Sequence, residues 1–300
     1  MNTTCLSGHP FLKTGLSLLL LSLLIWNCDQ PTKARARPPV PENEKPAAPS
    51  AWVDSASGGI VLDLNAMAQN GELPASDTVQ ISYDNHFSKN NKRYLGFPLA
   101  ELLDAVVFKR FAFDTTDAIV HFECTDGYRP TMPVSLIFGQ NAGYLVHRDL
   151  EAPPGRAWAD SLEEARFKPF YLVWDGTQPG DHRFMWPYGL IRIKLVSLRK
   201  EFKNAYPFNN PEMVAGFSLF NQNCMKCHAI NGVGGVIGPE FNYPKNITEY
   251  WTEANIMAFA RNPQSFRISS KMVPVQGLTD AEFKSIIGYL RFMAKHKALE

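Results

Sequence analysis

The most constraining feature of this chain is the pentapeptide Cys224-Met225-Lys226-Cys227-His228. Two thiols three positions apart can each add across one vinyl group of a haem, and the histidine that follows can bind the iron. A zinc half-site would need a second pair of ligands, and no other cysteine lies nearby in the sequence. A thioredoxin-like pair should open a helix after a strand, whereas a helical pattern here runs into the motif. The alternatives are therefore a zinc half-site, a redox pair or a chance match, and the pattern favours covalent haem.

Helical patterns lie on both sides of the motif. Pro211 suits a first helical position, and an apolar stripe follows over residues 214–220. After a glycine-rich loop, a short amphipathic helix is predicted from Thr252 to Arg261. Thr279 and Glu282 have the spacing of a capping box, which marks the start of a last helix.

Residues 206–300 resemble a class I cytochrome c, an all-α domain with one haem. The resemblance covers about a third of the chain. It rests on residues before the pentapeptide, in the loop after it and in the last two helices, namely Gly216, Phe220, Gly238-Pro239, Trp251-Thr252, Asn262-Pro263, Met272, Leu278-Thr279-Asp280 and Gly288-Tyr289-Leu290.

The resemblance implies a role for each matching residue. Cys224 and Cys227 would attach the haem, and His228 would be the proximal iron ligand. The loop residues Gly238-Pro239 would lie at the haem, where the Pro239 carbonyl orients the imidazole N–H. Trp251 matches a position that often contacts a haem propionate.

Met272 is the expected distal ligand. It lies in a loop where a side chain can reach the iron, and a thioether raises the potential relative to a second imidazole. Many relatives have proline directly after this methionine, whereas here Val273 intervenes. The alternatives are an open site or one of three other side chains, Met257, Met293 and His296.

Residues 1–28 are predicted to be an export signal. Lys13 precedes an apolar run, Gly15–Trp26, that suits a signal sequence and ends at Cys28. This arrangement predicts a bacterial lipoprotein, cleaved before Cys28 and lipidated on it, at the periplasmic side of a membrane. Ordinary cleavage nearby and an uncleaved anchor are the alternatives. Residues 29–51, rich in proline, alanine and charge, are predicted to be an extended tether.

Residues 52–205 are predicted to form a mixed α+β domain. Leu99–Val107 is expected to be helical, and five segments have strand character: Ile60–Leu64, Val79–Tyr83, Ile119–Cys124, Phe170–Trp174 and Leu190–Val196. The order of these pieces resembles the molybdopterin-binding domain of the sulfite oxidase superfamily. The cues are Tyr94–Leu99, the turn Thr125–Tyr128 and Pro187–Arg192.

The same resemblance argues against bound molybdenum. The superfamily's enzymes hold the metal through a cysteine upstream of the segment matching Tyr94–Leu99, and Ile81–His86 contains none. Cys124 is instead expected to be a small buried residue at a strand end. The cationic run Lys89–Arg93 has the charge to bind an anion, but it is expected to be a solvated loop. We therefore expect one covalent haem c and no molybdopterin.

The chain is thus predicted to have two folded domains, and the first hypothesis for its function is a membrane-tethered periplasmic electron carrier. The first domain would bind or recognise a redox partner whose identity is open. The alternatives are a molybdenum oxidoreductase with the haem as electron exit, and a haem-based sensor or scaffold. A formal net charge of +1 gives no reason to expect nucleic-acid binding.

Overall fold

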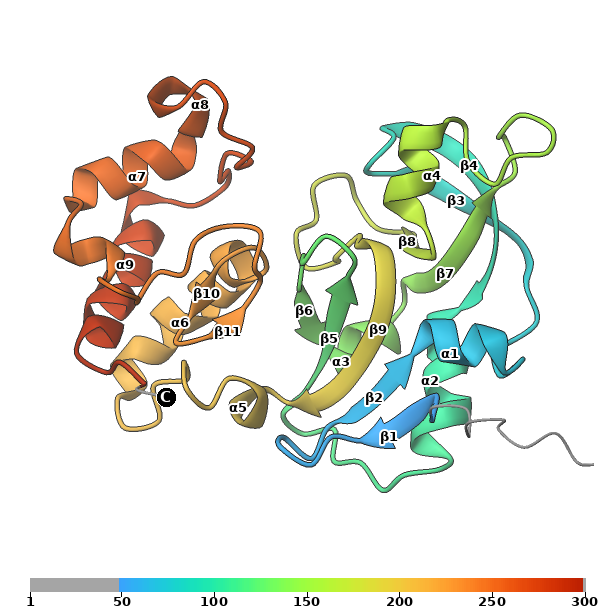
Figure 1. The fold of residues 1–300 in the computed structure, drawn as a ribbon, viewed down its shortest axis with the longest axis horizontal. Coiled ribbons are helices and arrows are strands. Elements are labelled where there is room, and N and C mark those ends of the chain that lie inside the picture. Colours follow the sequence, from blue (N-terminus) through green and yellow to red (C-terminus); the bar gives the residue numbers. More distant parts are fainter. Residues whose placement is uncertain (1–48, 299–300) are drawn as a thin grey trace, which may run out of the picture. The chain divides into compact units, whose positions relative to one another are not determined.

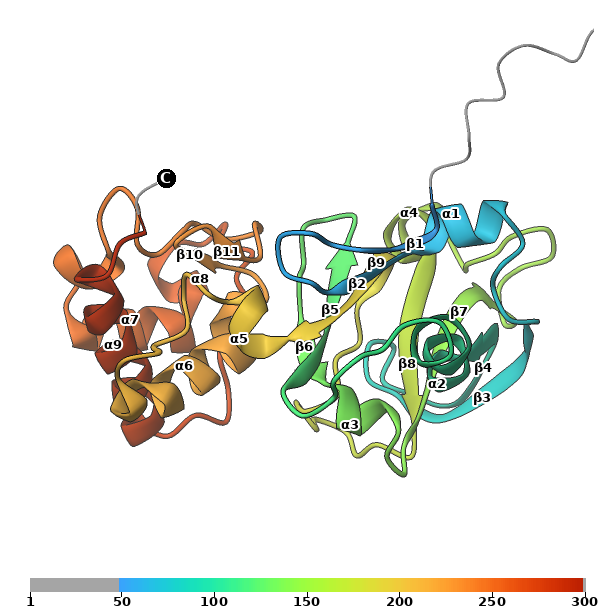
Figure 2. The ribbon, with the colours of Figure 1, turned by 90° about the horizontal axis from the view of Figure 1, so that it is seen from below.

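The structure is a computed structural model that describes residues 49–298, drawn as a ribbon in Figures 1 and 2. The predictions for the signal sequence, for Cys28 and for most of the 29–51 tether lie outside the described residues. Within residues 49–298, no helix combines the length and the apolar character that crossing a membrane requires.

The first part of the chain is built on a nine-stranded sheet in which every pairing is antiparallel. The main path runs β1-β2-β9-β8-β7-β4-β3, and β5 pairs with both β6 and β9. Figure 1 shows the long strand β9 between β2 and β5. The strands are β1 (Ala51–Val53), β2 (Ile60–Asp63), β3 (Asp77–Asp84), β4 (Lys89–Pro98), β5 (Ala118–Cys124), β6 (Thr131–Pro133), β7 (Ala142–Asp149), β8 (Phe170–Asp175) and β9 (Tyr188–Ser197).

Strand β8 shows why this sheet is buried on both faces. Its side chains alternate, as the two-residue period of a strand requires. Phe170, Leu172 and Trp174 belong to the larger apolar cluster, whereas Tyr171 and Val173 belong to a second cluster. Both sets are almost fully buried, so the strand reads as a continuous hydrophobic run.

Short helices connect the strands. The expected helix over Leu99–Val107 is found as an α-helical turn that continues as a π-helical turn to Phe108. The helical segments of this part are α1 (Leu64–Gln69), α2 (Leu99–Leu103), η1 (Asp104–Phe108), α3 (Val134–Ile137), α4 (Ser161–Phe167) and α5 (Leu198–Glu201).

All five predicted strands are present, and the described part of residues 52–205 is rich in sheet. The expectation of a solvated loop over Lys89–Arg93 is wrong, because these residues open strand β4. Lys92 is buried there and pairs with Asp149, whose carboxylate oxygen lies 2.6 Å from its Nζ atom. A partner 57 residues away in sequence compensates its charge, so local charge density gave the wrong prediction.

The second part is helical, with one two-stranded ribbon. Its elements are η2 (Pro211–Met213), α6 (Val214–Phe220), η3 (Asn221–Met225), β10 (Ala229–Ile230), β11 (Val233–Gly234), η4 (Ile247–Glu249), α7 (Glu253–Arg261), α8 (Pro263–Phe266) and α9 (Asp280–Ala294). The capping box predicted from Thr279 and Glu282 is present at the start of α9.

Helices α6 and α9 cross closely at a glycine. A Cβ atom on Gly216 would overlap the carbonyl oxygen of Ser285 and lie 2.8 Å from Cβ of Tyr289. Only glycine therefore fits at this crossing. On the same interface, Tyr289 packs against Phe217 and Phe220.

The segment after α5 packs into the helical core. The hydroxyl of Tyr289 donates a hydrogen bond to the Ala205 carbonyl at 2.8 Å. Phe202 is buried against Phe217, and both belong to one apolar cluster that also takes in Val196 of strand β9. The sheet-rich part and the helical part are therefore joined by buried side chains as well as by the backbone of the segment between them.

Candidate haem site

The Cys224–His228 segment folds into a tight loop at the end of α6. The π-helical turn η3 carries Cys224, and the Cys224 carbonyl accepts hydrogen bonds from the N–H of Cys227 at 3.1 Å and of His228 at 2.9 Å. The N–H of Gly238 closes the loop by donating to the Cys227 carbonyl at 2.8 Å. Burial raises the pKa of the Cys224 thiol to about 12 and also raises that of Cys227, so both sulfurs keep their protons at neutral pH.

The His228 imidazole is held in one orientation. Its Nδ1 donates to the Pro239 carbonyl at 2.8 Å, and the ring stacks on Phe241 with 4.2 Å between centroids. Burial lowers the pKa of His228, which favours the neutral ring. A neutral imidazole with its proton on Nδ1 has a lone pair on Nε2, which makes no hydrogen bond to any residue in 49–298. This arrangement is the one that an iron ligand needs.

Gly238 lies directly against the imidazole. A Cβ atom on this residue would lie 2.5 Å from Nδ1 and 2.7 Å from Nε2 of His228. Any larger side chain would push the ring away from its carbonyl partner. Gly238 and Pro239 therefore fix His228 from two sides.

Three buried asparagines, not identified from the sequence, hold the loop after the motif. Asn242 donates to Oδ1 of Asn231 at 2.6 Å, and Asn246 donates to Oδ1 of Asn242 at 2.8 Å. Asn242 and Asn246 also donate to carbonyls at the end of α9, those of Met293 and Leu290, at 2.9 and 3.0 Å. This ladder fastens the loop to α9, and the three asparagines in a segment of sixteen residues were its sequence signal.

Trp251 lies in an aromatic group next to α7. Its ring meets Phe259 edge-on at 5.2 Å and stacks on Phe266 at 6.3 Å. The structure does not test the predicted contact with a haem propionate, and that role stays a prediction.

Met272 lies in the loop after α8, with a half-buried side chain. Its carbonyl accepts a hydrogen bond from Gln264 at 2.9 Å, and its N–H donates to the Ser270 hydroxyl at 3.3 Å. These bonds fix its backbone. The described contacts do not link it to His228, and its place as an axial ligand stays a prediction.

The rivals of Met272 occupy different environments. Met293 is 2% exposed within the apolar cluster under α9, where its sulfur is surrounded by side chains. Met257 is half-buried on α7. His296 stacks on Phe292 at 4.0 Å and its Nδ1 bonds to the Phe292 carbonyl, at the C-terminal end of α9.

Large apolar side chains stand uncovered around this loop system. Six of the ten exposed large hydrophobic residues among those described lie between residues 236 and 273. Ile268 is 96% exposed and Val273, next to Met272, is 79% exposed. Exposed apolar side chains concentrated in one stretch of the chain are typical of a binding surface. The residues present therefore fit a flat, largely apolar cofactor beside His228.

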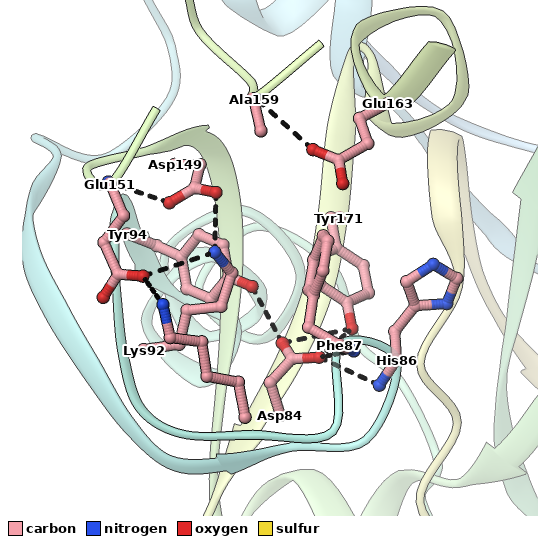
Figure 3. Close-up of polar contacts among 11 residues, drawn as sticks. Asp84, His86, Phe87, Lys92, Tyr94, Asp149, Glu151, Ala159, Glu163 and Tyr171 are labelled. Carbon is pink, nitrogen blue, oxygen red and sulfur yellow. Dashed lines mark hydrogen bonds and ion pairs between the residues drawn. The ribbon is translucent and has the colours of Figure 1, made fainter. Parts of the chain in front are cut away.

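The sheet-rich part contains a buried polar network of its own, drawn in Figure 3. The Asp84 carboxylate accepts a hydrogen bond from Tyr94 at 2.9 Å and two from the N–H groups of His86 and Phe87. Beside it lies the Lys92–Asp149 pair. Each buried charge has its partners, so the network is structural. Within residues 49–298, no three His, Cys, Asp or Glu side chains gather as a metal site would require.

Cys124 ends strand β5 and is 6% exposed within the main apolar cluster. Burial raises the pKa of its thiol far above the usual value. The prediction of a small buried residue at a strand end is confirmed.

Comparison with known proteins identifies the helical part. The sequence model of the cytochrome c family, described as "Cytochrome c", matches residues 213–294. A cytochrome c from Tetrahymena pyriformis is 30% identical over 92 residues, which cover 84% of that protein and 26% of this chain. A cytochrome c oxidase subunit 2 from Alkalihalophilus pseudofirmus is 32% identical over 119 residues, which are 35% of each chain.

The chain therefore spans about a third of the length of that oxidase subunit. No solved structure matches the chain. The family model covers the helices and loops that carry Cys224, Cys227 and His228, and a cytochrome c domain implies covalently bound haem c. By its C-terminal domain, this chain belongs to the cytochrome c family.

Proposed function

We propose that this protein is an exported, membrane-tethered electron carrier that moves single electrons through one haem c. The observation that carries the proposal is the state of His228. Its Nδ1 is bonded to the Pro239 carbonyl at 2.8 Å and its Nε2 is without a hydrogen bond among the described residues, beside two cysteines at the spacing for thioether attachment.

The proposed roles follow from these contacts. Cys224 and Cys227 would hold the haem by adding their S–H groups across its two vinyl groups, which forms two thioether bonds and releases nothing. His228 would bind the iron through Nε2, and Pro239 and Gly238 hold its ring in place. When bound, haem supplies the one-electron chemistry. No side chain is assigned acid–base work.

Met272 is proposed as the distal ligand. Met293 is the poorest alternative, because its burial in the helical core would have to be undone before its sulfur could bind a metal. Met257 provides a matched control, since it is half-buried and lies outside the core. A thioether ligand stabilises reduced iron, which suits an electron carrier.

The location and the partners are also proposals. Thioether attachment of haem takes place outside the cytoplasmic membrane, so the apolar run before Cys28 would serve as the export signal and Cys28 as the lipidated residue. Residues 29–51 would form the tether, at the periplasmic face of a bacterial membrane. The partial match to an oxidase subunit fits an electron-transfer role. The redox partner would be another protein, and nucleic acid is not proposed as a partner.

We further infer that residues 52–205 form an accessory, partner-binding domain with a fold like the molybdopterin-binding domain of the sulfite oxidase superfamily. Strand β4 leads directly into α2, the Thr125–Tyr128 turn follows β5, and Tyr188–Ser197 forms β9, which is the order that the resemblance implies. Cys124 is enclosed by apolar side chains, which suits a structural residue better than a metal ligand.

The test uses full-length protein matured in a host that attaches haem c. We expect one covalent haem per chain, lost in the Cys224→Ala Cys227→Ala double variant. Met272→Ala should remove the weak absorption band of methionine-bound ferric haem, and Met257→Ala should keep it. Survival of the band in Met272→Ala would refute the ligand assignment.

The same preparation separates the alternatives. About one molybdenum per haem, lost on Cys124→Ala, would favour the oxidoreductase. Carbon monoxide binding to the reduced protein would favour a sensor with an open iron site.

A further inference from the structure

The turn that follows strand β5, Thr125–Arg129, lies against the haem-attachment segment. The N–H of Arg129 donates to the Lys226 carbonyl at 2.9 Å, inside the Cys224–His228 motif. The N–H of Val236 donates to the Gly127 carbonyl at 3.3 Å. Backbone groups of the sheet-rich part thus bond to Lys226, the neighbour of Cys227, and to Val236 in the loop after the motif.

The turn is fixed from the side of the sheet. The N–H of Thr125 donates to the Gly189 carbonyl of strand β9 at 2.9 Å, and the N–H of Gly127 donates to the Cys124 carbonyl at 3.1 Å. The Asp126 carboxylate accepts from the N–H of Tyr128 at 2.9 Å. A turn held by these bonds is a firm surface against which the attachment segment rests.

The contact leaves no room for an extra methyl group. Gly127 has a φ of +86°, and a Cβ atom there would lie 2.6 Å from Cγ2 of Val236. The Arg129 side chain reaches the same loop, and the Glu123 carboxylate balances its charge. Its guanidinium donates to the Gly234 carbonyl at 3.5 Å and lies 3.6 Å from the Glu123 carboxylate.

We propose that the Thr125–Arg129 turn is a cover built onto the haem-attachment segment and that it raises the reduction potential of the haem. The inference rests on the attachment at Cys224 and Cys227 proposed above. Ferric haem carries one more positive charge than ferrous haem. Excluding water beside Cys227 disfavours this extra charge, and therefore disfavours the oxidised state.

Two glycine variants of the haem-loaded full chain test the cover. Gly127→Ala places a methyl group 2.6 Å from Cγ2 of Val236, so the turn or this side chain must move and their contact is disturbed. Gly180→Ala is the matched control, because its φ of +78° imposes the same backbone strain and no atom lies within 4 Å of the added methyl group. The measurement is a spectroelectrochemical titration of the haem.

We expect Gly127→Ala to lower the midpoint potential and Gly180→Ala to leave it unchanged. At the wild-type midpoint, the reduced-to-oxidised ratio of Gly127→Ala should fall by roughly threefold to tenfold, tenfold being 59 mV for one electron. Equal potentials in both variants would overturn the proposal, whether both stay at the wild-type value or both shift together.

Arg129→Ala decides the question if Gly127→Ala does not fold. It removes the side-chain bond to the Gly234 carbonyl and so loosens the turn, which should lower the potential. Wild-type potential in Arg129→Ala would overturn the role of the turn. A failure of the proposed function looks different, because a chain without covalent haem would give no haem titration at all.

Discussion

The crossing of α6 and α9 at Gly216 makes a quantitative prediction. Gly216 and Gly288 are both helical glycines of the cytochrome domain, one on each of these helices. A methyl group at Gly216 would meet the Ser285 carbonyl and Cβ of Tyr289, whereas one at Gly288 would have nothing within 4 Å. The Gly216→Ala and Gly288→Ala variants therefore differ mainly in steric overlap.

The magnitude follows from two opposing effects. Replacing a glycine in a helix by alanine stabilises the helix by about 1 kcal/mol, and this gain applies to both variants. Forcing extra volume into a packed interface costs about 1–3 kcal/mol, and more where backbone must move. Gly288→Ala should thus raise the free energy of unfolding by up to about 1 kcal/mol. Gly216→Ala should lie about 1–3 kcal/mol below Gly288→Ala.

Guanidinium unfolding of the haem-loaded full chain provides the assay. Haem absorbance reports on the cytochrome domain and on the parts that pack against it, and any contribution from the sheet-rich part is common to both variants. The midpoint of Gly216→Ala should fall relative to Gly288→Ala, with an unchanged slope. Equal stabilisation of the two variants would refute the close crossing at Gly216.

Three further predictions concern buried groups. Lys92→Ala leaves the Asp149 carboxylate without its ion-pair partner at 2% side-chain exposure, so it should lower the free energy of unfolding by about 3–5 kcal/mol. The control Lys109→Ala removes an exposed ion pair and should lower the free energy of unfolding by less than about 1 kcal/mol. A loss below about 1 kcal/mol for Lys92→Ala would contradict the buried pair. Asn242→Ala should cost about 1–3 kcal/mol by leaving the asparagine ladder open, with wild-type stability as the contrary result. Cys124 should resist iodoacetamide in the folded protein at pH 8, because burial raises its pKa, and react after unfolding; rapid native labelling would refute its burial.

The candidate haem site was predicted from local signals, because the cysteines and His228 lie within five residues. The hydrogen bond from His228 to the Pro239 carbonyl, which the family resemblance implied, is present. The capping box of α9 was likewise a matter of two residues, Thr279 and Glu282. Short-range geometry of this kind is set by the backbone period and by side-chain hydrogen bonds.

In the sheet-rich part, strand positions could be predicted from the sequence only where the strands are strongly apolar. Strands β5, β8 and β9 were predicted close to their observed bounds. Strand β4 was missed, because the polar run at its start reads as a loop until the ion pair of Lys92 with Asp149 on β7 is known. That pairing depends on the fold, and no local pattern encodes it.

Two features of the site depend on the fold in the same way. The side chains of the asparagine ladder donate to carbonyls at the end of α9, about fifty residues later in the chain. The turn at Gly127 packs against Val236, which is more than a hundred residues away in the sequence. Each lies where separate segments meet, which spacing and periodicity do not reveal.

The central claim is that one haem is attached through Cys224 and Cys227. Intact mass spectrometry of the matured full chain, after extraction with acidified organic solvent, tests it most directly. The mass should exceed that of the polypeptide by one haem in the wild type, and the double variant Cys224→Ala Cys227→Ala should show the polypeptide mass alone. A wild-type chain that loses its haem to the solvent, or a double variant that keeps it, would contradict the account.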